Sequence, residues 1–293
     1  MKTLTVITST YNRANLLYNL FDSLQNQTSN DFEWLIIDDG SNDNTEKVLY
    51  EIKKKANFKV NYIKKKNSGK HKSLNLGISK INTKLTIIVD SDDKLLPNAV
   101  ELIVRYYLKY KDNKNIGVFS FLKCYSNGDI VVTMNQDEIL SSYIEYRIKE
   151  NRPGDMAEVF YTKILKENPF PEFKDEKFLS EDILWIKIAK KYKCMFINIP
   201  IYECEYLEDG LTFNDKVMKF SSPLGSVLRG KSLMSKECGL KSQVKGAIIY
   251  NCYAKILKNR IPKDLNLDTN FQKALVFLTK PLGGFYYKKW KPL

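Results

Sequence analysis

The feature that most constrains the fold is a regular alternation of strand-like and helix-like segments over the first 122 residues. Short strand-like segments, most of them apolar and rich in β-branched residues as is typical of buried strands, occupy residues 4–8, 34–38, 59–64, 85–89 and 116–122. Segments with helical spacing lie between them, at residues 16–24, 48–52, 70–81 and 97–110. This alternation predicts an α/β fold, with a doubly wound, mainly parallel sheet flanked by helices.

Several helix ends can also be predicted. Asn12 is expected to cap the helix at 16–24, and Ser180 a helix that begins at 180–182. Pro97 is expected at the first position of the helix that runs to about Tyr110. The pair Asn127-Gly128, between apolar segments, predicts a hairpin in an otherwise irregular α+β stretch at 123–210.

The last third of the chain is mainly helical by its pattern and strongly basic. Residues 211–293 hold 16 Lys/Arg and 4 Asp/Glu, whereas residues 1–210 hold 31 and 30. The net charge of +13 therefore resides almost entirely in the tail. Such asymmetry suggests that the tail meets an anionic surface.

The lack of recognisable targeting signals and the pattern of cysteines both favour a cytoplasmic protein. No apolar run reaches the roughly 18 residues of a spanning helix, and the N-terminus lacks a signal-peptide core. The five cysteines form no CxxC pair, so they are expected to be reduced and mostly buried. Zinc is disfavoured, because His71 is the single histidine.

Polar segments follow three of the predicted strands, at Ser9–Asn12, Asp38–Ser41 and Asp90–Asp93. Ligands of parallel sheets bind beyond the carboxyl ends of the strands. The segment Asp90-Ser91-Asp92-Asp93 places three carboxylates together, which is costly unless a cation or hydrogen-bond donors compensate. A hard divalent ion with a nucleotide diphosphate would do so; the alternative is an acidic loop that caps the following helix.

The other motifs each have a structural alternative. Asp38-Asp39-Gly40-Ser41 could be an ordinary βα turn. Glu181-Asp182 could cap a helix. Lys70 and Lys72 could face phosphates or form a solvated basic turn, and a packing or surface role is favoured for His71. The sequence contains no GxGxxG or GxSxG motif, so NAD enzymes and serine hydrolases are poorly supported.

Taken together, the motifs resemble the family 2 glycosyltransferases of the GT-A fold. The matching segments, in family order, are Val6–Arg13, Phe32–Ser41, Gly69–Gly77 and Val89–Asp93. The resemblance implies a glycosyltransferase domain at 1–210, with a nucleotide-binding half at 1–122 and an acceptor half at 123–210. Residues 211–293 would form a basic helical extension.

The resemblance also implies a role for each matching position. Tyr11 and Asp39 would contact the nucleotide base, usually uracil, with Ser9 and Thr10 beside them. In the segment that resembles a DxD motif, Asp92 would bind the metal and Asp90 would lie near the ribose or the sugar. Lys70 is a further candidate for nucleotide binding, and Asp182 would be the catalytic base, although Glu181 remains the alternative.

The implied reaction is transfer of a sugar, with inversion, from a UDP-sugar to an acceptor hydroxyl with the help of Mn²⁺ or Mg²⁺. The sequence lacks the QxxRW motif of processive synthases, so one sugar per acceptor visit is expected. A lipid-linked glycan in bacterial surface polysaccharide synthesis is the implied acceptor. An apolar stripe (Phe271, Ala274, Leu275, Leu278) with Lys273 and Lys280, followed by the aromatic–lysine segment 285–291, suggests peripheral binding to the inner face of the plasma membrane.

Three other classes remain as alternatives. A sugar-nucleotidyltransferase would want a Gly-rich basic N-terminal loop, which Ser9–Arg13 is not. A nucleic-acid-binding protein would suit the sequence pI of about 9.2, but the expected ligand face is acidic, so no nucleic-acid partner is expected. The intact acidic motifs argue against an inactive relative.

Overall fold

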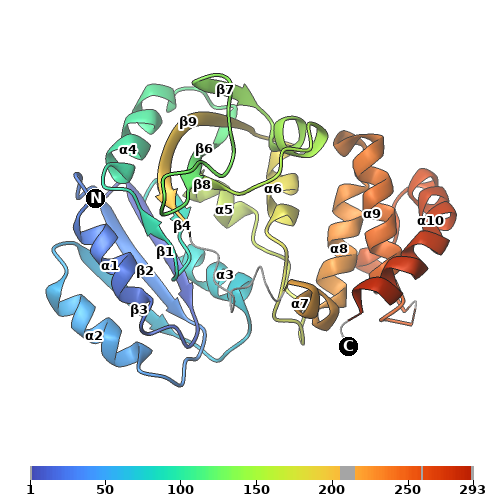
Figure 1. Cartoon of the computed structure of the whole chain (residues 1–293), viewed down its shortest axis with the longest axis horizontal. Helices are drawn as coiled ribbons and strands as arrows, with labels where there is room; N and C mark the ends of the chain where they lie inside the picture. The colour runs from blue at the N-terminus through green and yellow to red at the C-terminus, as the bar shows by residue number, and fades with distance from the viewer. Residues whose placement is uncertain (1, 205–214, 259, 292–293) are drawn as a thin grey trace. The chain divides into compact units, whose positions relative to one another are not determined.

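The chain folds into two compact units. The computed structural model describes residues 2–204, 215–258 and 260–291, and Figure 1 shows its elements. Unit 1 comprises Met1–Ser141, Pro153–Pro169 and Lys191–Glu205; unit 2 comprises Ser142–Arg152, Phe170–Lys190 and Tyr206–Leu293. The boundary expected at residue 210 lies outside the described residues, and unit 2 includes two segments that precede it.

A nine-stranded sheet forms the centre of unit 1 in the described part of the chain, in the order β3-β2-β1-β4-β8-β6-β9-β5 with β7 beside β9. The strands are β1 (Leu4–Thr10), β2 (Phe32–Asp38), β3 (Lys59–Lys64), β4 (Leu85–Ile88), β5 (Lys94–Leu95), β6 (Ile116–Cys124), β7 (Glu138–Ser141), β8 (Met156–Tyr161) and β9 (Lys193–Glu203). The strands β3, β2, β1 and β4 pair in parallel, as do β6 and β9. The remaining pairings, which involve β8, β5 and β7, are antiparallel.

This arrangement confirms the predicted α/β class. The parallel strands β1 to β4 come from the regular alternation in the sequence, but β6, the strand expected at 116–122, lies apart from them between β8 and β9. The antiparallel pairings come from the irregular stretch after residue 122, because β8 returns between β4 and β6. No helical crossover precedes such a return, so its pairing could not be read from the alternation.

Helices cover both faces of the sheet: α1 (Leu17–Gln25), α2 (Thr45–Lys55), α3 (Lys70–Lys80), α4 (Ala99–Tyr110) and α5 (Thr162–Glu167). Alternate residues of the strands share one large core with α1, α2 and α4, among them Leu4, Val6 and Trp34. On the other face α3 lies very close to the sheet. A Cβ on Gly77 would be 2.5 Å from Ile7 Cδ1, so only glycine permits this approach.

Unit 2 is helical and has a core of its own. Its elements are a π-helical turn (Ile144–Lys149), α6 (Asp182–Ala189), α7 (Asp215–Ser221), α8 (Pro223–Leu233), a 3₁₀ turn (Lys236–Cys238), α9 (Gly239–Ala254), a second 3₁₀ turn (Lys263–Leu265) and α10 (Asn270–Trp290). Val227, Leu233 and Ala247 are buried together with Ile144 and Ile186. The predicted helical C-terminal region is thereby confirmed. Across the described ranges, no helix is both long enough and apolar enough to cross a bilayer.

Three predicted helix ends are wrong in detail. α1 begins at Leu17 after Leu16, because the Asn12 side chain instead accepts a hydrogen bond from the Asn42 amide at 2.8 Å, with Asn12 at φ 53°. α6 begins after Glu181 with no side-chain cap, so Ser180 is not its cap. α4 begins at Ala99, two residues after Pro97.

The hairpin prediction is correct only for its turn. The Tyr125 amide donates to Asp129 O at 2.8 Å around Gly128, whose φ is 88°. The return segment forms a single bridge, Cys124 with Ile130, rather than a strand. The predicted burial of the cysteines is confirmed, since all five are buried and free.

Candidate functional site

The register of the parallel strands brings the polar segments to one edge of the sheet. Thr10 lies opposite Asp38, and Asp38 lies opposite Lys64. The Val89 amide donates to Ile7 O at 3.0 Å, which places Asp90 just beyond the end of β4. The segments after β1, β2 and β4 therefore meet, as expected for the ligand-binding edge of such a sheet.

An acidic cluster occupies this edge. Carboxylate oxygens of Asp90, Asp92 and Asp93 lie within 4.8 Å of one another. Tyr202 of β9 makes two hydrogen bonds to the cluster. Its hydroxyl accepts one from the Asp90 amide at 3.1 Å and donates one to Asp93 Oδ2 at 2.7 Å. Burial, with the negative charge of Asp90, raises the pKa of Asp93 to about 6.

Basic side chains of the chain itself compensate this charge. Lys70 Nζ lies 2.6 Å from Asp90 Oδ1, and Arg13 Nη1 lies 2.7 Å from Asp92 Oδ2. Although burial acts to raise it, the ion pair with Lys70 holds the pKa of Asp90 below its ordinary value. Lys123 Nζ lies 4.0 Å from the centre of the Tyr202 ring. Burial acts to lower the pKa of Lys123, but Asp93 and Asp90 raise it above its ordinary value.

The cluster has the chemistry of a site for a hard divalent cation. Its donors are all carboxylate oxygens, which Mg²⁺ and Mn²⁺ prefer. Three such oxygens leave room in an octahedral shell for other oxygens, such as those of a diphosphate. The residues present therefore fit a metal ion, provided that Arg13 releases Asp92 when the ion binds.

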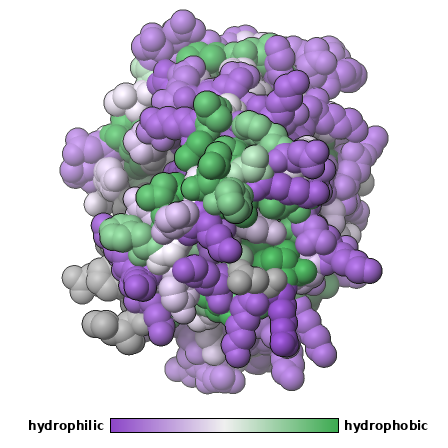
Figure 2. All heavy atoms as spheres, turned by 90° about the vertical axis from the view of Figure 1, so that its right-hand side faces the viewer, coloured by the Kyte–Doolittle hydropathy of each residue, from purple (hydrophilic) through white to green (hydrophobic). Residues whose placement is uncertain are grey.

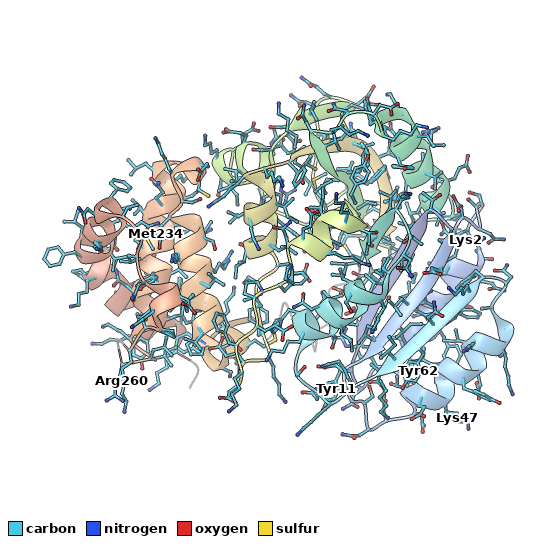
Figure 3. The ribbon with its side chains drawn as sticks, turned by 180° about the vertical axis from the view of Figure 1, so that it is seen from behind. Lys2, Tyr11, Lys47, Tyr62, Met234 and Arg260 are labelled. Carbon is cyan, nitrogen blue, oxygen red and sulfur yellow. The ribbon has the colours of Figure 1, made fainter. Side chains whose placement is uncertain are left out.

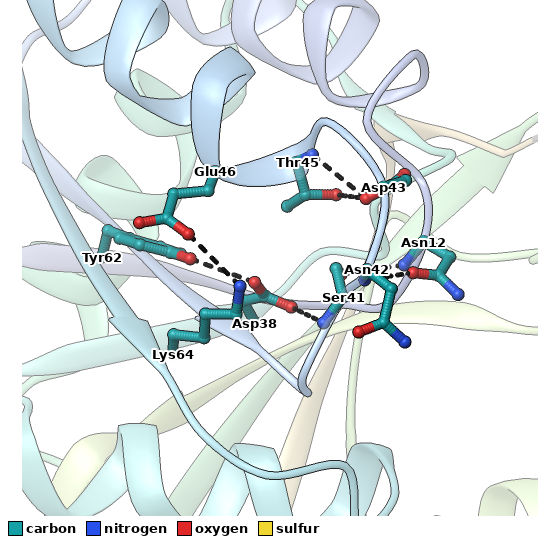
Figure 4. A network of polar contacts seen from close by, with 9 residues as sticks. All are labelled: Asn12, Asp38, Ser41, Asn42, Asp43, Thr45, Glu46, Tyr62 and Lys64. Carbon is teal, nitrogen blue, oxygen red and sulfur yellow. Dashed lines mark hydrogen bonds and ion pairs between the residues drawn. The ribbon is translucent and has the colours of Figure 1, made fainter.

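The two aspartates after β2 have different surroundings. Asp38 accepts hydrogen bonds from the Ser41 amide at 2.7 Å and from the Tyr62 hydroxyl at 3.0 Å. It therefore links the turn after β2 to strand β3, as Figure 4 shows. Asp39 accepts from four donors on the segment that enters α3, namely Lys65 Nζ, the Ser68 and Gly69 amides and Ser73 Oγ. Burial acts to raise the pKa of Asp39, but these donors lower it overall.

The remaining candidates in unit 1 differ in exposure. Tyr11 is 44% exposed at the end of β1 (Figure 3). Ser9 is half-buried and His71 is buried. A ring that is open to solvent at the sheet edge can stack on a planar ligand. The burial of His71 agrees with the packing role favoured from the sequence.

Asp182, the candidate base, belongs to unit 2. It stands at the start of α6, where Arg229 Nε donates to both of its carboxylate oxygens, at 2.8 and 3.1 Å. Burial and the positive charge of Arg229 lower the pKa of Lys245 nearby. The ion pair with Arg229 holds the carboxylate in a fixed orientation.

Three residues that contact the candidates or act on them electrostatically were not found from the sequence. Tyr202 is 109 positions from Asp93, and Arg229 is 47 positions from Asp182. Lys123 lies in β6, opposite Tyr202 of β9. None of these residues belongs to a motif, and no local spacing in the sequence relates them to their partners. They reach their partners only through the pairing of β9 with β6 and the packing of α8.

Comparison with known proteins identifies the first part of the chain. Residues 5–121 match the family model described as glycosyl transferase family 2. An uncharacterized glycosyltransferase of Rickettsia bellii is 30% identical over 71% of this chain, but the match spans only 29% of that protein. The chain thus covers less than a third of the length of that relative.

Two further comparisons extend over nearly the whole chain. A GalNAc(5)-diNAcBac-PP-undecaprenol beta-1,3-glucosyltransferase of Campylobacter jejuni is 26% identical over 88% of this chain and 85% of its own length. The crystal structure of S. aureus TarS 1-349 in complex with UDP-GlcNAc covers 99% of this chain and 92% of its own, with a TM-score of 0.65 and 17% identity. The family match, the relatives and the shared fold agree: residues 5–121 belong to glycosyl transferase family 2, and the chain has a GT-A fold.

Proposed function

We propose that this chain is an inverting, metal-dependent glycosyltransferase that uses a UDP-sugar donor and acts on a lipid-linked glycan in bacterial surface polysaccharide synthesis. The observation that carries the proposal is the acidic cluster at the sheet edge, with Lys70 and Arg13 paired to it. Support comes from the family match, from the solved relative with UDP-GlcNAc and from the glucosyltransferase of Campylobacter jejuni, whose name describes an undecaprenol-linked glycan.

The donor would bind at the edge of unit 1. Tyr11 would stack on the uracil, and Asp39, already fixed by four donors, would accept a further hydrogen bond from it. Ser9 and Asp90 would contact the ribose or the sugar, and Asp92 would bind Mn²⁺ or Mg²⁺. When bound, the ion supplies charge stabilisation to the departing nucleoside diphosphate. Lys70 and Arg13, freed from their carboxylates, would pair with phosphate oxygens.

Asp182 would accept the proton of the acceptor hydroxyl as that oxygen attacks the anomeric carbon. A base must be ionised and fixed in position before it can do so. The contact with Arg229 supports the second requirement, because it fixes the position of the carboxylate. Because the attack and the departure of the leaving group occur on opposite sides, configuration at the anomeric carbon would invert.

The proposed acceptor places the enzyme at the inner face of the plasma membrane. A lipid-linked acceptor stays in the bilayer, so the enzyme must come to it. Residues 211–293 hold 16 basic and only 4 acidic residues, which favours an anionic membrane surface as the place where the enzyme meets its acceptor.

A thermal-shift screen of nucleotide sugars, with and without Mn²⁺, tests the proposal. The correct donor should raise the melting temperature further as its concentration rises above its Kd, and more so with the ion. Asp92→Asn should remove the ion-dependent part, whereas Asp112→Asn, an exposed acid of the same unit, should not. Stabilisation by no nucleotide sugar under either condition would refute the proposal.

Turnover then separates the candidate enzyme classes and tests the base. Release of a nucleoside diphosphate indicates sugar transfer, whereas pyrophosphate would indicate a nucleotidyltransferase. Asp182→Asn should lower transfer by at least about a hundredfold and leave donor binding unchanged. Retained turnover would place the base elsewhere, with Glu181 the first alternative to test.

A further inference from the structure

The helix α10 has its polar side buried and its apolar side exposed. Its buried residues include Gln272, Thr279 and Gly283. Its exposed residues include five large apolar ones, Phe271 (50%), Phe277 (76%), Leu278 (70%), Leu282 (48%) and Phe285 (59%). A surface helix of a soluble domain normally shows the opposite arrangement. Leu275, expected from the sequence in the apolar stripe, is buried.

Specific contacts with α9 fix this orientation. Asn251 Nδ2 donates to Val276 O at 2.7 Å and to Thr279 Oγ1 at 3.1 Å. A Cβ on Gly283 would lie 2.3 Å from Asn251 Cβ, so the two helices meet where only glycine fits. The capping box between Thr269 and Gln272 defines where α10 begins. The apolar side is therefore held outward by a built interface.

Four of the five exposed apolar residues form one stripe, and Phe277 lies to one side of it. Phe271, Leu278 and Phe285 follow one another at intervals of seven residues, with Leu282 beside them. At a rise of about 1.5 Å per residue the stripe is about 21 Å long. Figure 2 shows apolar side chains gathered on this face of the molecule and surrounded by hydrophilic ones.

The charged side chains of α10 and the residues that follow it are all positive. Residues 270–293 contain five lysines and no acidic residue. Lys273 and Lys280 lie four residues before and three residues after Phe277 and so flank it on the helix surface, and Lys288 and Lys289 lie in the last turn of the helix. An apolar stripe flanked by lysines matches the acyl and headgroup layers of an anionic bilayer.

We propose that α10 is an in-plane membrane anchor, with Phe271, Phe277, Leu278, Leu282 and Phe285 inserted among the lipids of an anionic bilayer and the lysines on its headgroups. This inference deepens the proposed function, because it names the surface that brings the enzyme to a lipid-linked acceptor. A second copy of the chain is the less favoured occupant. Pairing two such stripes would bring two sets of lysines together without an acidic residue of either helix to neutralise them.

Flotation of the full chain with phosphatidylcholine vesicles, with and without phosphatidylglycerol, tests the anchor. The chain should bind the anionic vesicles at low salt and bind neutral vesicles more weakly. Phe277→Ser with Leu278→Ser should weaken partitioning at least about tenfold, since two exposed side chains lose their burial in lipid. Lys273→Gln with Lys280→Gln should weaken it about fivefold per lysine on anionic vesicles only.

The matched control is Leu108→Ser with Leu240→Ser, two exposed leucines outside α10, which should bind like the wild type. Absence of vesicle binding by the wild type, or equal loss in the control, would overturn the proposal. Concentration-dependent dimers that Phe277→Ser abolishes, without vesicle binding, would assign the stripe to a second copy instead. Stabilisation by the nucleotide sugar should be the same in all variants, so a failure of the anchor is distinguishable from a failure of the proposed function.

Discussion

Each carboxylate of the acidic cluster already has a protein partner: Asp90 has Lys70, Asp92 has Arg13 and Asp93 has Tyr202. Three neighbouring acids in the sequence require a cation or hydrogen-bond donors to compensate them. The structure supplies donors, and so the cluster is tolerable before any ligand binds. A metal ion and a diphosphate would exchange partners with these groups rather than enter an uncompensated site.

At the scale of residues, the sequence predicted which segments meet at the site better than it predicted the contacts of their side chains. The segments after β1, β2 and β4 could be predicted to meet, because parallel strands end at one edge. The sequence could not predict that Asp38 holds a turn while Asp39 binds the α3 segment. The two are neighbours at the end of one strand and differ only in the direction of their side chains. Tyr202 and Arg229 lie too far along the chain for any local pattern to point to them.

Asp93 should make stability depend on pH. Its pKa is about 6 in the folded chain against an ordinary 3.8. Between these values the folded state retains a proton that the unfolded state releases, so stability falls as the pH rises from about 4 to about 6 and then levels. Asp93→Asn can still accept the bond from Tyr202 and cannot ionise. It should therefore be more stable than the wild type by about 1–3 kcal/mol at about pH 8 and nearly equal at about pH 4.

Urea denaturation of both proteins at the two pH values, without divalent ions, measures this difference. Asp112→Asn, which replaces an exposed acid, is the control and should show no such divergence. A stability difference for Asp93→Asn that is the same at both pH values would contradict the assignment.

At the scale of elements, the helices of unit 2 depend on close backbone contacts that composition does not reveal. A Cβ on Gly230 of α8 would lie 2.7 Å from Gly246 O and 2.7 Å from Tyr250 N of α9. Both neighbours are backbone atoms and cannot move aside without moving the helix. The helical pattern of the tail predicted α9, but the side that packs on α8 is set by these glycines rather than by an apolar repeat.

Gly230→Ala should accordingly destabilise the chain by about 1–3 kcal/mol, despite the higher helix propensity of alanine. Gly284→Ala on α10 is the matched control, because its Cβ would meet only the mobile end of the Lys255 side chain, Nζ at 2.8 Å. That variant should be neutral or slightly more stable. Chemical denaturation of both variants measures the effect; equal stability would show that the α8–α9 contact relaxes without cost.

At the scale of the whole molecule, the chain passes back and forth between the two units. Segments 142–152 and 170–190 belong to unit 2 although unit 1 continues at 153–169 and 191–205. A boundary sought from a change in composition falls near residue 210, because the charge asymmetry begins there. The apolar residues that join the early segments to unit 2, Ile144 and Ile186, carry no such signal.

A chain cut after residue 210 should for this reason fail to behave as an independent domain. It keeps Ile144 and Ile186 but loses Val227, Leu233 and Ala247, with which they form one core. Exposing a core face of this kind favours aggregation. We expect the fragment 1–210 to be largely insoluble and to bind a hydrophobic dye strongly, whereas the full chain does neither. Co-expression of residues 206–293 as a separate chain should restore solubility, because it returns the missing side of that core. A soluble, dye-negative fragment 1–210 would mean that the early segments of unit 2 are stable without the helices that follow them.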